Sequence, residues 1–362
     1  MGIKRRNVVG VLALAGCLLI GAVASTAAAG FDKQGTLSAD SLVLRNLIGE
    51  IEVLGHDGSS FEIEVRVQGG DADPERVRIE ITEGRDAEWN IVFPLKESKR
   101  YVYPRMNGGS TSFGMDDGSW LSNLFGALSG GDVKVSGSGS GLEIWADVTV
   151  KVPRGKRVVV NHGVGRIHAT DVDADLVLDS RSGPVEVVGA NGSVSVDTGS
   201  GQVSVESIRG NLQVDTGSGK VTVRDCECQN VLVDTGSGRV ELENVDGSEL
   251  TVDTGSGGVR AKAIGADHVT IDTGSGSVSL QLDRMGTGRF EIDTGSGSIT
   301  LQLPPDASAD VEAETGSGGI KLDLAGSYDI RRQEDDEVRV VIGGGEASLV
   351  LDTGSGSIRI SQ

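Results

Sequence analysis

Short runs in which aliphatic and polar residues alternate fill most of this chain, and they flank one repeated string, Asp-Thr-Gly-Ser-Gly. In the copy that begins at Asp253, Leu250 and Val252 precede the string and Val259 and Ala261 follow it. Alternation with a period of two predicts a β-strand with one apolar face. Each repeat is therefore expected to be two short strands joined by a corner. The acidic residues that open the strings are Asp197, Asp215, Asp234, Asp253, Asp272, Asp293, Asp352 and, as Glu-Thr-Gly-Ser-Gly, Glu314.

The spacing of the strings predicts how the repeats assemble. Successive acidic residues are 18, 19, 19, 19, 21, 21 and 38 residues apart. A two-stranded unit of this size cannot bury its own apolar face, whereas stacked units share a continuous core. We therefore predict an all-β fold, a single parallel β-helix (β-solenoid) of about eleven coils at ~4.8 Å each, preceded by irregular strands. The glycines of the string are expected to supply positive backbone angles at each corner.

Weaker copies of the pattern extend the array in both directions. Asn161 and Asp179 head two earlier coils, and the interval of 38 residues predicts one more coil over Tyr328–Ile342. The chain then divides into a signal peptide (1–29), an N-terminal strand region with a degenerate coil (30–100), an insertion (101–141) and the β-solenoid (142–362). The last strand, from Ile358, is expected to be an open edge that is free to pair with another molecule, including end to end with a second copy.

The insertion is rich in Gly and Ser and lacks a sheet pattern. Five apolar residues in it recur at helical spacing behind Ser119, which predicts a short amphipathic helix. Two interpretations stay open, a cap packed on the rod or a docking element for a membrane or a partner. The partner-binding candidates are Trp120, Leu121, Leu124, Phe125 and Leu128.

The N-terminus has the features of an export signal. Lys4-Arg5-Arg6 precede an apolar run, and Ala27-Ala28-Ala29 fit a cleavage site. The alternative cut lies in Leu14-Ala15-Gly16-Cys17, which resembles a bacterial lipobox and would leave Cys17 as a lipidated first residue. We expect an exported protein of the periplasm, the outer membrane or cell surface, or the extracellular space. No later segment is long and apolar enough to span a bilayer.

Charge and cysteine content narrow the class of partner. The formal net charge is −20, and removal of residues 1–29 takes away three positive charges and no negative ones. This acidity argues against nucleic acid and anionic lipid as partners. Cys226 and Cys228 are separated by one residue, which is too close for an ordinary disulfide.

The sequence predicts no catalytic residues, no cofactor and no dedicated metal site. The four histidines are scattered, and the serines of the strings have no partner histidine. Stacked coils would place the acidic residues in one column, where neighbouring carboxylates repel one another. We expect hydrogen bonds from the corner amides to hold them. The alternative is a weak cation ladder, with calcium along Asp197, Asp215, Asp234, Asp253, Asp272, Asp293, Glu314 and Asp352.

The strings, the signal and the degenerate coil over Leu44–Val53 resemble the bacterial putative-adhesin β-solenoid family, exported domains of unknown function, over residues 40–362. The resemblance implies a parallel β-helix of the cell envelope and supplies no catalytic residues. We expect a noncatalytic interaction, adhesion or scaffold module whose partner is an envelope protein or a glycan. The alternative is an envelope-stress or regulatory module that acts through residues 101–141. A β-helix enzyme that acts on polysaccharides is the third interpretation.

Overall fold

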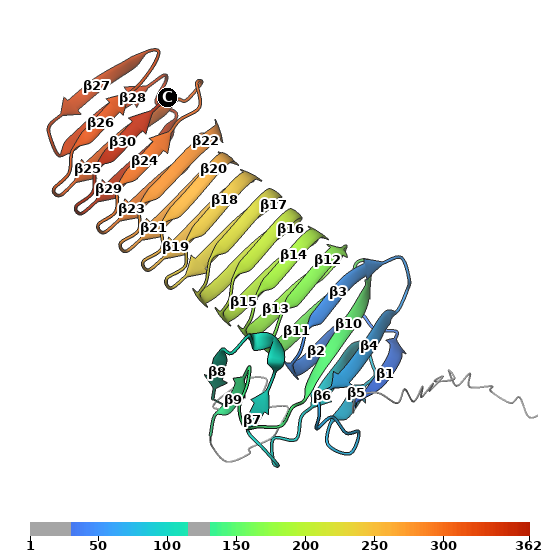
Figure 1. Cartoon of the computed structure of the whole chain (residues 1–362). Coiled ribbons are helices and arrows are strands. Elements are labelled where there is room, and N and C mark those ends of the chain that lie inside the picture. The colour runs from blue at the N-terminus through green and yellow to red at the C-terminus, as the bar shows by residue number, and fades with distance from the viewer. Residues whose placement is uncertain (1–29, 115–130) are drawn as a thin grey trace, which may run out of the picture.

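The computed structural model describes residues 30–114 and 131–362. Within these residues the chain is all-β, as predicted, with a long mixed sheet of 27 strands and a separate sheet of three. The one helical element described is a 3-10 turn, η1 (Pro104–Met106). The strands stack into a long rod with the small sheet beside its N-terminal end (Figure 1).

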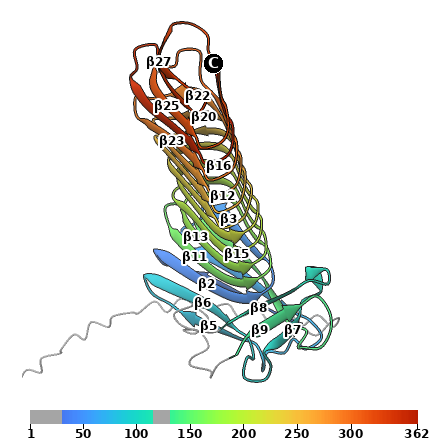
Figure 2. The same cartoon turned by 90° about the vertical axis from the view of Figure 1, so that its left-hand side faces the viewer.

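The long sheet is folded into two rows of strands, because each Asp-Thr-Gly-Ser-Gly corner carries the chain from one row to the other (Figure 2). Neighbours in a row pair in parallel through the repeats. Row A stacks β5 (Arg78–Thr82), β6 (Asp86–Val92), β2 (Ser41–Ile48), β11 (Arg157–Val164), β13 (Asp175–Ser182), β15 (Val194–Ser200), the second halves of β16 (Val203–Ser218) and β17 (Val221–Thr235), β19 (Glu249–Thr254), β21 (His268–Thr273), β23 (Arg289–Thr294), β29 (Ala347–Thr353), β25 (Ala309–Thr315), β28 (Glu337–Ile342) and β27 (Tyr328–Gln333).

Row B faces row A across the core. Its strands, in the order in which they stack, are β1 (Gly30–Leu37), β4 (Phe61–Gln68), β10 (Trp145–Pro153), β3 (Ile51–His56), β12 (Ile167–Val172), β14 (Val185–Asn191), the first halves of β16 and β17, β18 (Val240–Asp246), β20 (Val259–Ala266), β22 (Val278–Met285), β24 (Ile299–Gln302), β30 (Ile358–Ser361) and β26 (Ile320–Asp323).

The alternating pattern decides which side chains reach the core. Val252, Ile271 and Ile292 lie directly above one another in row A and are fully buried. Polar residues that alternate with the apolar ones along each strand, such as Thr251 next to Val252, point outward. Because every repeat places aliphatic groups at the same inward positions, stacking joins them into one continuous apolar core.

The C-terminal end does not follow the order of the sequence. β29 lies between β23 and β25, and β30 lies between β24 and β26. The last repeat is therefore inserted beneath the repeat that precedes it in the chain. The prediction of an open strand at Ile358 is wrong, because β30 is paired on both sides.

The interval of 38 residues has a different explanation from the predicted extra coil. Tyr328–Ile342 forms an antiparallel hairpin, β27 with β28, and β28 pairs antiparallel with β25. The predicted coil is therefore wrong. Alternation in Tyr328–Ile342 correctly indicates two strands. The pattern does not specify which neighbouring strand each of them pairs with.

The N-terminal part adds strands around the degenerate coil. β2 and β3 stack directly against β11 and β12, and β10 pairs parallel with β3 and antiparallel with β4. The insertion contains a small sheet, β7 (Arg100–Val102), β9 (Val133–Ser136) and β8 (Ser110–Phe113), although no sheet pattern was expected there. Strands of three or four residues are too short to show a clear alternation.

Candidate functional site

The threonines of the repeated string form a buried column along the corner edge of the rod. The hydroxyl of Thr273 accepts a hydrogen bond from the amide of Gly276 at 3.0 Å and donates one to the carbonyl of Gly257, in the previous repeat, at 3.0 Å. Each such threonine thus closes its own corner and links it to the neighbouring corner in the stack. The same pair of bonds is made by Thr254, Thr294, Thr315 and Thr353.

The last glycine of each string is needed for close packing between corners. A Cβ atom on Gly257 would overlap the carbonyl oxygen of Gly238 in the preceding repeat. Neither glycine has a backbone φ in the left-handed region, so the predicted reason for these glycines is wrong at this position. The corners approach one another too closely for any side chain.

The acidic residues form the predicted column on the outer side of the same edge. Asp234 lies in register with Asp215 on one side and Asp253 on the other. The pKa of Asp234 is raised, chiefly by desolvation and then by its two neighbours, and burial with a neighbouring carboxylate also raises the pKa of Asp215 and of Asp293. Row A continues the column from Asp179 through Asp293 to Asp352 and Glu314.

The corner amides do not hold these carboxylates as predicted. Among the described residues, no hydrogen bond or ion pair reaches the side chain of any residue of the acidic column from Asp197 onward, whereas the string's threonines take up the corner amides. No group of three His, Cys, Asp or Glu residues in residues 30–114 and 131–362 is placed to hold a metal ion. Each repeat adds one carboxylate, so the column can attract cations but does not enclose one.

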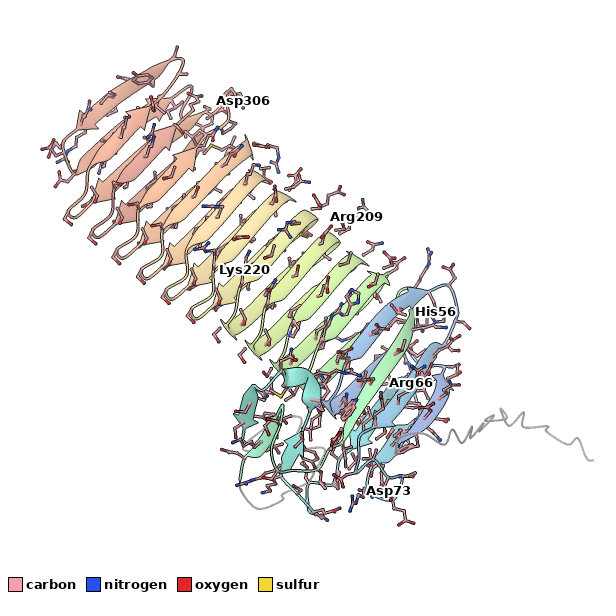
Figure 3. All side chains as sticks on the ribbon, in the orientation of Figure 1. His56, Arg66, Asp73, Arg209, Lys220 and Asp306 are labelled. Carbon is pink, nitrogen blue, oxygen red and sulfur yellow. A yellow bond between two sulfur atoms is a disulfide. The ribbon has the colours of Figure 1, made fainter. Side chains whose placement is uncertain are left out.

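Outward positions on the flat faces carry polar side chains that pair between repeats. Figure 3 shows Arg209 and Lys220 on the outer surface of the rod. Arg209 contacts Glu227 at 3.1 Å and Lys220 contacts Glu241. Such exposed pairs contribute little to stability.

A charged clamp attaches the insertion to the rod. The Arg105 guanidinium makes two bonds to the Asp147 carboxylate, at 3.1 and 2.9 Å, and approaches Glu50 at 3.3 Å. Asp147 lies on β10 and also accepts the amide of Glu50. Tyr103 packs against Trp145 and beneath Arg105, and burial raises its pKa to about 12. The small sheet is therefore fixed to the rod by paired charges and aromatic packing.

A hollow of about 330 Å³ is lined by residues of the small sheet and of the loops that flank it. Arg100 and Lys134 line it from neighbouring strands, together with Ser110 and Ser136. Neither cation forms an ion pair in the described part of the chain, which sets this hollow apart from the acidic rod. This hollow could not be predicted from the sequence, because its two cations are 34 positions apart and meet only through strand pairing.

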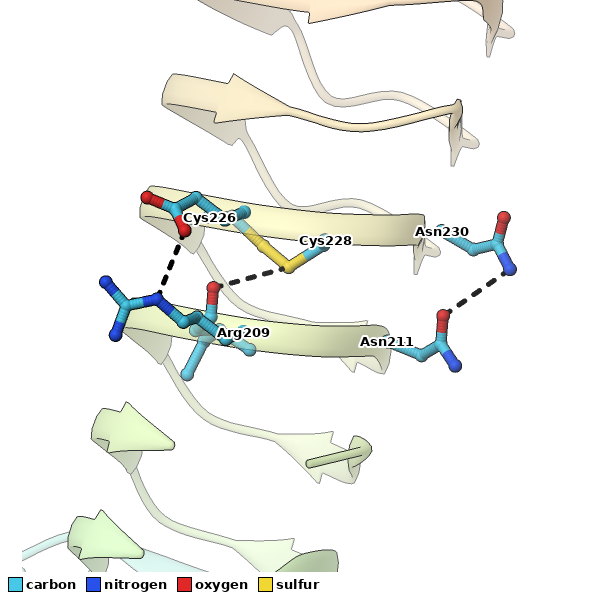
Figure 4. The surroundings of a disulfide bond; sticks show 7 residues. Arg209, Asn211, Cys226, Cys228 and Asn230 are labelled. Atoms are coloured by element: carbon cyan, nitrogen blue, oxygen red, sulfur yellow. Dashed lines mark hydrogen bonds and ion pairs between the residues drawn. A yellow bond between two sulfur atoms is a disulfide. The ribbon is translucent and has the colours of Figure 1, made fainter. Parts of the chain in front are cut away.

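Cys226 and Cys228 form a disulfide, so the prediction that they are too close is wrong (Figure 4). Asp225, just before them, has a φ of 51°, and the two Cα atoms are 5.4 Å apart. That separation lies within the range that a disulfide spans. Both sulfurs are buried in the core of the rod.

Two histidines of one repeat have different surroundings. His162 is fully buried between the carbonyls of Asn46 and Gly49, at 3.2 and 3.0 Å, and desolvation lowers its pKa to about 4. His168 is partly exposed and contacts the hydroxyl of Thr170. His162 is a packing residue, and the two do not form a joint site.

The remaining candidates lie outside the described residues. These are the apolar group Trp120, Leu121, Leu124, Phe125 and Leu128, and the lipidation candidate Cys17. Within the described residues, no helix is long and apolar enough to cross a membrane.

The corner column, the two rows and the repeat length define an all-β repeat protein. The chain belongs to the Toastrack DUF4097 family, whose model matches residues 73–361. This confirms the resemblance to the putative-adhesin family of domains of unknown function that the strings suggested. None of the curated proteins matches the sequence.

Two solved structures are similar to this chain over most of its length. A putative cell adhesion protein from Clostridium sporogenes is 11% identical with a TM-score of 0.20, covering 92% of this chain and 99% of its own. A putative adhesin from Bacteroides fragilis is 10% identical with a TM-score of 0.31, covering 91% of this chain and 96% of its own. Scores this low carry no argument about function.

Proposed function

We propose that this protein is an exported, noncatalytic interaction or scaffold module of the cell envelope, built on a parallel β-helix of about eleven coils. The rod serves as a rigid spacer, and the insertion at its N-terminal end serves as the contact region. The partner is an envelope protein or a glycan.

The clamp between Arg105 and Asp147 carries this proposal. It fixes the small sheet to β10, and with it the end of β8 and the start of β9, which flank residues 115–130 in the sequence. The cationic hollow of Arg100 and Lys134 lies in the same sheet. In the corner string, by contrast, the threonine side chains and the last glycines take part in stacking, which leaves only the acidic residue and the serine facing outward.

Binding to isolated envelopes tests the proposal. In the first variant, residues 115–130 are replaced by a short turn, which the antiparallel pairing of Phe113 with Val133 can accommodate. We expect this protein to melt like the parent and to lose co-sedimentation with envelopes. Trp120→Ser with Phe125→Ser should have the same effect.

A matched control changes apolar surface elsewhere. Leu232→Ser alters an exposed side chain in the middle of the rod and should leave envelope binding unchanged. Unchanged binding after removal of residues 115–130 would refute the insertion as the contact region. A fall in melting temperature would instead show that the segment caps the rod.

A further inference from the structure

The C-terminal end of the rod is stepped, because its two rows end at different heights. Row B ends at β26, which pairs on one side only, with β30. Row A continues past the matching strand β25 by two strands, β28 and then β27. Two strands of row A therefore project beyond the end of row B.

The inner face of this projection is apolar, and it is uncovered on the outermost strand, β27. Tyr328 is paired with Ile342 and Ile330 with Val340, so all four side chains share one face of the hairpin. Val340 and Ile342 are buried, whereas Tyr328 and Ile330 are 48% and 41% exposed. Ile320 and Leu322 of β26, on the other side of the step, are only partly buried. A second row of strands is missing over β27.

Both edges of the step are free for strand pairing. β27 pairs only with β28, and β26 only with β30, within the described chain. Neither edge strand contains proline. The exposed charged residues are Lys321 and Asp323 on β26, and Asp329, Arg331 and Arg332 on β27. Edges of soluble sheets are usually protected by proline, by inward-pointing charge or by a cover. Neither edge has proline, inward-pointing charge or a cover, although β26 is short and carries Lys321, and β27 has a β-bulge between Ile330 and Arg332.

We propose that a second copy of this chain fills the step, so that two rods join through their C-terminal ends. A two-fold axis parallel to the strands and midway between the rows reverses the rod and brings row A of one copy above row B of the other. The two-strand projection of each copy then occupies the two-strand gap of its partner. Both gaps are filled by one symmetry operation, which is what favours a second copy over a different protein.

Strand directions agree with this arrangement. β25 and β27 run in the same direction, since both are antiparallel to β28, and β26 runs in the opposite direction after the corner. Rotation about an axis parallel to the strands keeps these directions. The partner's β27 therefore lies antiparallel to β26, a pairing that extends the sheet across the joint. Tyr328 and Ile330 of both copies become buried together.

Sedimentation equilibrium of the protein purified after export tests the joint. We expect a dimer, and we expect Ile330→Lys to raise the dissociation constant by roughly tenfold or more, because it places a charge in a buried contact. Leu232→Lys is the matched control, since Leu232 is 38% exposed in the middle of the rod, and it should leave the dissociation constant unchanged. Because the side chains of Ile330 and Leu232 are both exposed in the monomer, neither variant should change the unfolding temperature of the monomer. A parent protein that stays monomeric at all soluble concentrations, or a dimer that Ile330→Lys does not weaken, would overturn the proposal.

Spin labels test which ends meet. A label at Asp335→Cys, in the turn between β27 and β28, should show dipolar coupling to its counterpart in the dimer. A label at Asp57→Cys, near the N-terminal end, should show none. Coupling between labels at Asp57 and none at Asp335 would contradict a C-terminal joint.

Discussion

Each repeat turns once at each of the two long edges of the rod. The two edges differ in how closely their residues repeat along the sequence. The corner edge repeats Asp-Thr-Gly-Ser-Gly almost without change. The far edge, where row B bends back toward row A, repeats a backbone conformation instead. Its residues have φ between 51° and 70° at steps of 18 or 19 residues, and they are Asp171, Gly189, Ser207, Asp225, Asn244 and Ala263.

The difference shows what makes a repeat visible in a sequence. At the corner edge, threonines bond to the glycines of the previous repeat, and glycines pack directly on the backbone of their counterparts. A change there affects two repeats at once. At the far edge the left-handed conformation recurs, and five residue types adopt it, glycine most readily and then Asn and Asp. Contacts between equivalent side chains are local there, as where Asn244 donates a hydrogen bond to Asp225 at 2.6 Å. Sequence repetition therefore follows the close contacts that each corner makes with the next corner in the stack, rather than the path of the backbone alone.

The largest expected effect comes from filling the space between corners. Gly257→Ala places a methyl group against the carbonyl of Gly238, where the backbone cannot move without disturbing both repeats. We expect a loss of about 3 kcal/mol in the free energy of unfolding, as for other overpacked sites. Urea denaturation followed by circular dichroism measures it. A loss below about 1 kcal/mol would mean that the corners are not in close contact.

Removing a corner hydroxyl should have a smaller effect that depends on the repeat. Thr273→Val removes two hydrogen bonds and leaves a buried amide and a buried carbonyl without that partner, so we expect a loss of about 1–2 kcal/mol. Thr216 is equally buried, but its hydroxyl has no partner among the described residues. Thr216→Val should therefore be neutral or stabilising in the same denaturation experiment. Equal losses in both variants would show that the hydroxyls do not act through these bonds.

The acidic column should slightly destabilise the rod at neutral pH. Desolvation and the neighbouring carboxylates raise the pKa of Asp234 above the value of the unfolded chain, so the fold prefers the protonated form. Its unfavourable effect is complete above the raised pKa and is relieved as the pH falls through it. Asp234→Asn should raise the melting temperature at pH 7 by an amount of the order of 1 °C, and by less in acid or high salt.

An ion-paired acidic residue provides the control for that experiment. Asp246 contacts Arg284 at 2.6 Å, so Asp246→Asn should lower the melting temperature or leave it unchanged. A decrease for Asp234→Asn at pH 7 would show that the column is stabilised by a partner, such as a bound cation.

The smallest effect is expected at the far edge. Ala263 has a φ of 54°, which glycine adopts without strain, but glycine also makes the unfolded chain more flexible. These two terms oppose each other, so Ala263→Gly should change the free energy of unfolding by no more than about 1 kcal/mol. Thermal unfolding measures this change beside that of Gly257→Ala. A change at the far edge as large as that at the corner would remove the distinction between the two edges.

Much of the rod could be predicted from the sequence because alternation and the strings report directly on burial and corners. Residues such as Val252 and Thr254 lie inside and Asp253 outside, as a period of two requires. The pairing order at the C-terminal end could not be predicted. The strands around Leu351 and Ala313 have the same pattern, so both are acceptable neighbours for β23, and the sequence does not rank them.

The features near the N-terminal end were hidden for another reason. The clamp joins Arg105 to Asp147, and the hollow joins Arg100 to Lys134, across stretches with no repeat to set their register. The disulfide between Cys226 and Cys228 was not predicted because a separation of one residue was judged too close, whereas the chain has a left-handed residue at Asp225 and the two Cα atoms lie 5.4 Å apart. Each of these depends on a local departure from the pattern that made the rest of the rod predictable.

Calcium titration of the purified protein tests most directly whether the repeated corner is a structural element or a binding site. We predict millimolar affinity at best, and unchanged circular dichroism and melting temperature after a chelator is added, because the corners are held by threonine and glycine contacts. Several sites of micromolar affinity, or unfolding on addition of the chelator, would contradict this and make the acidic column the functional site.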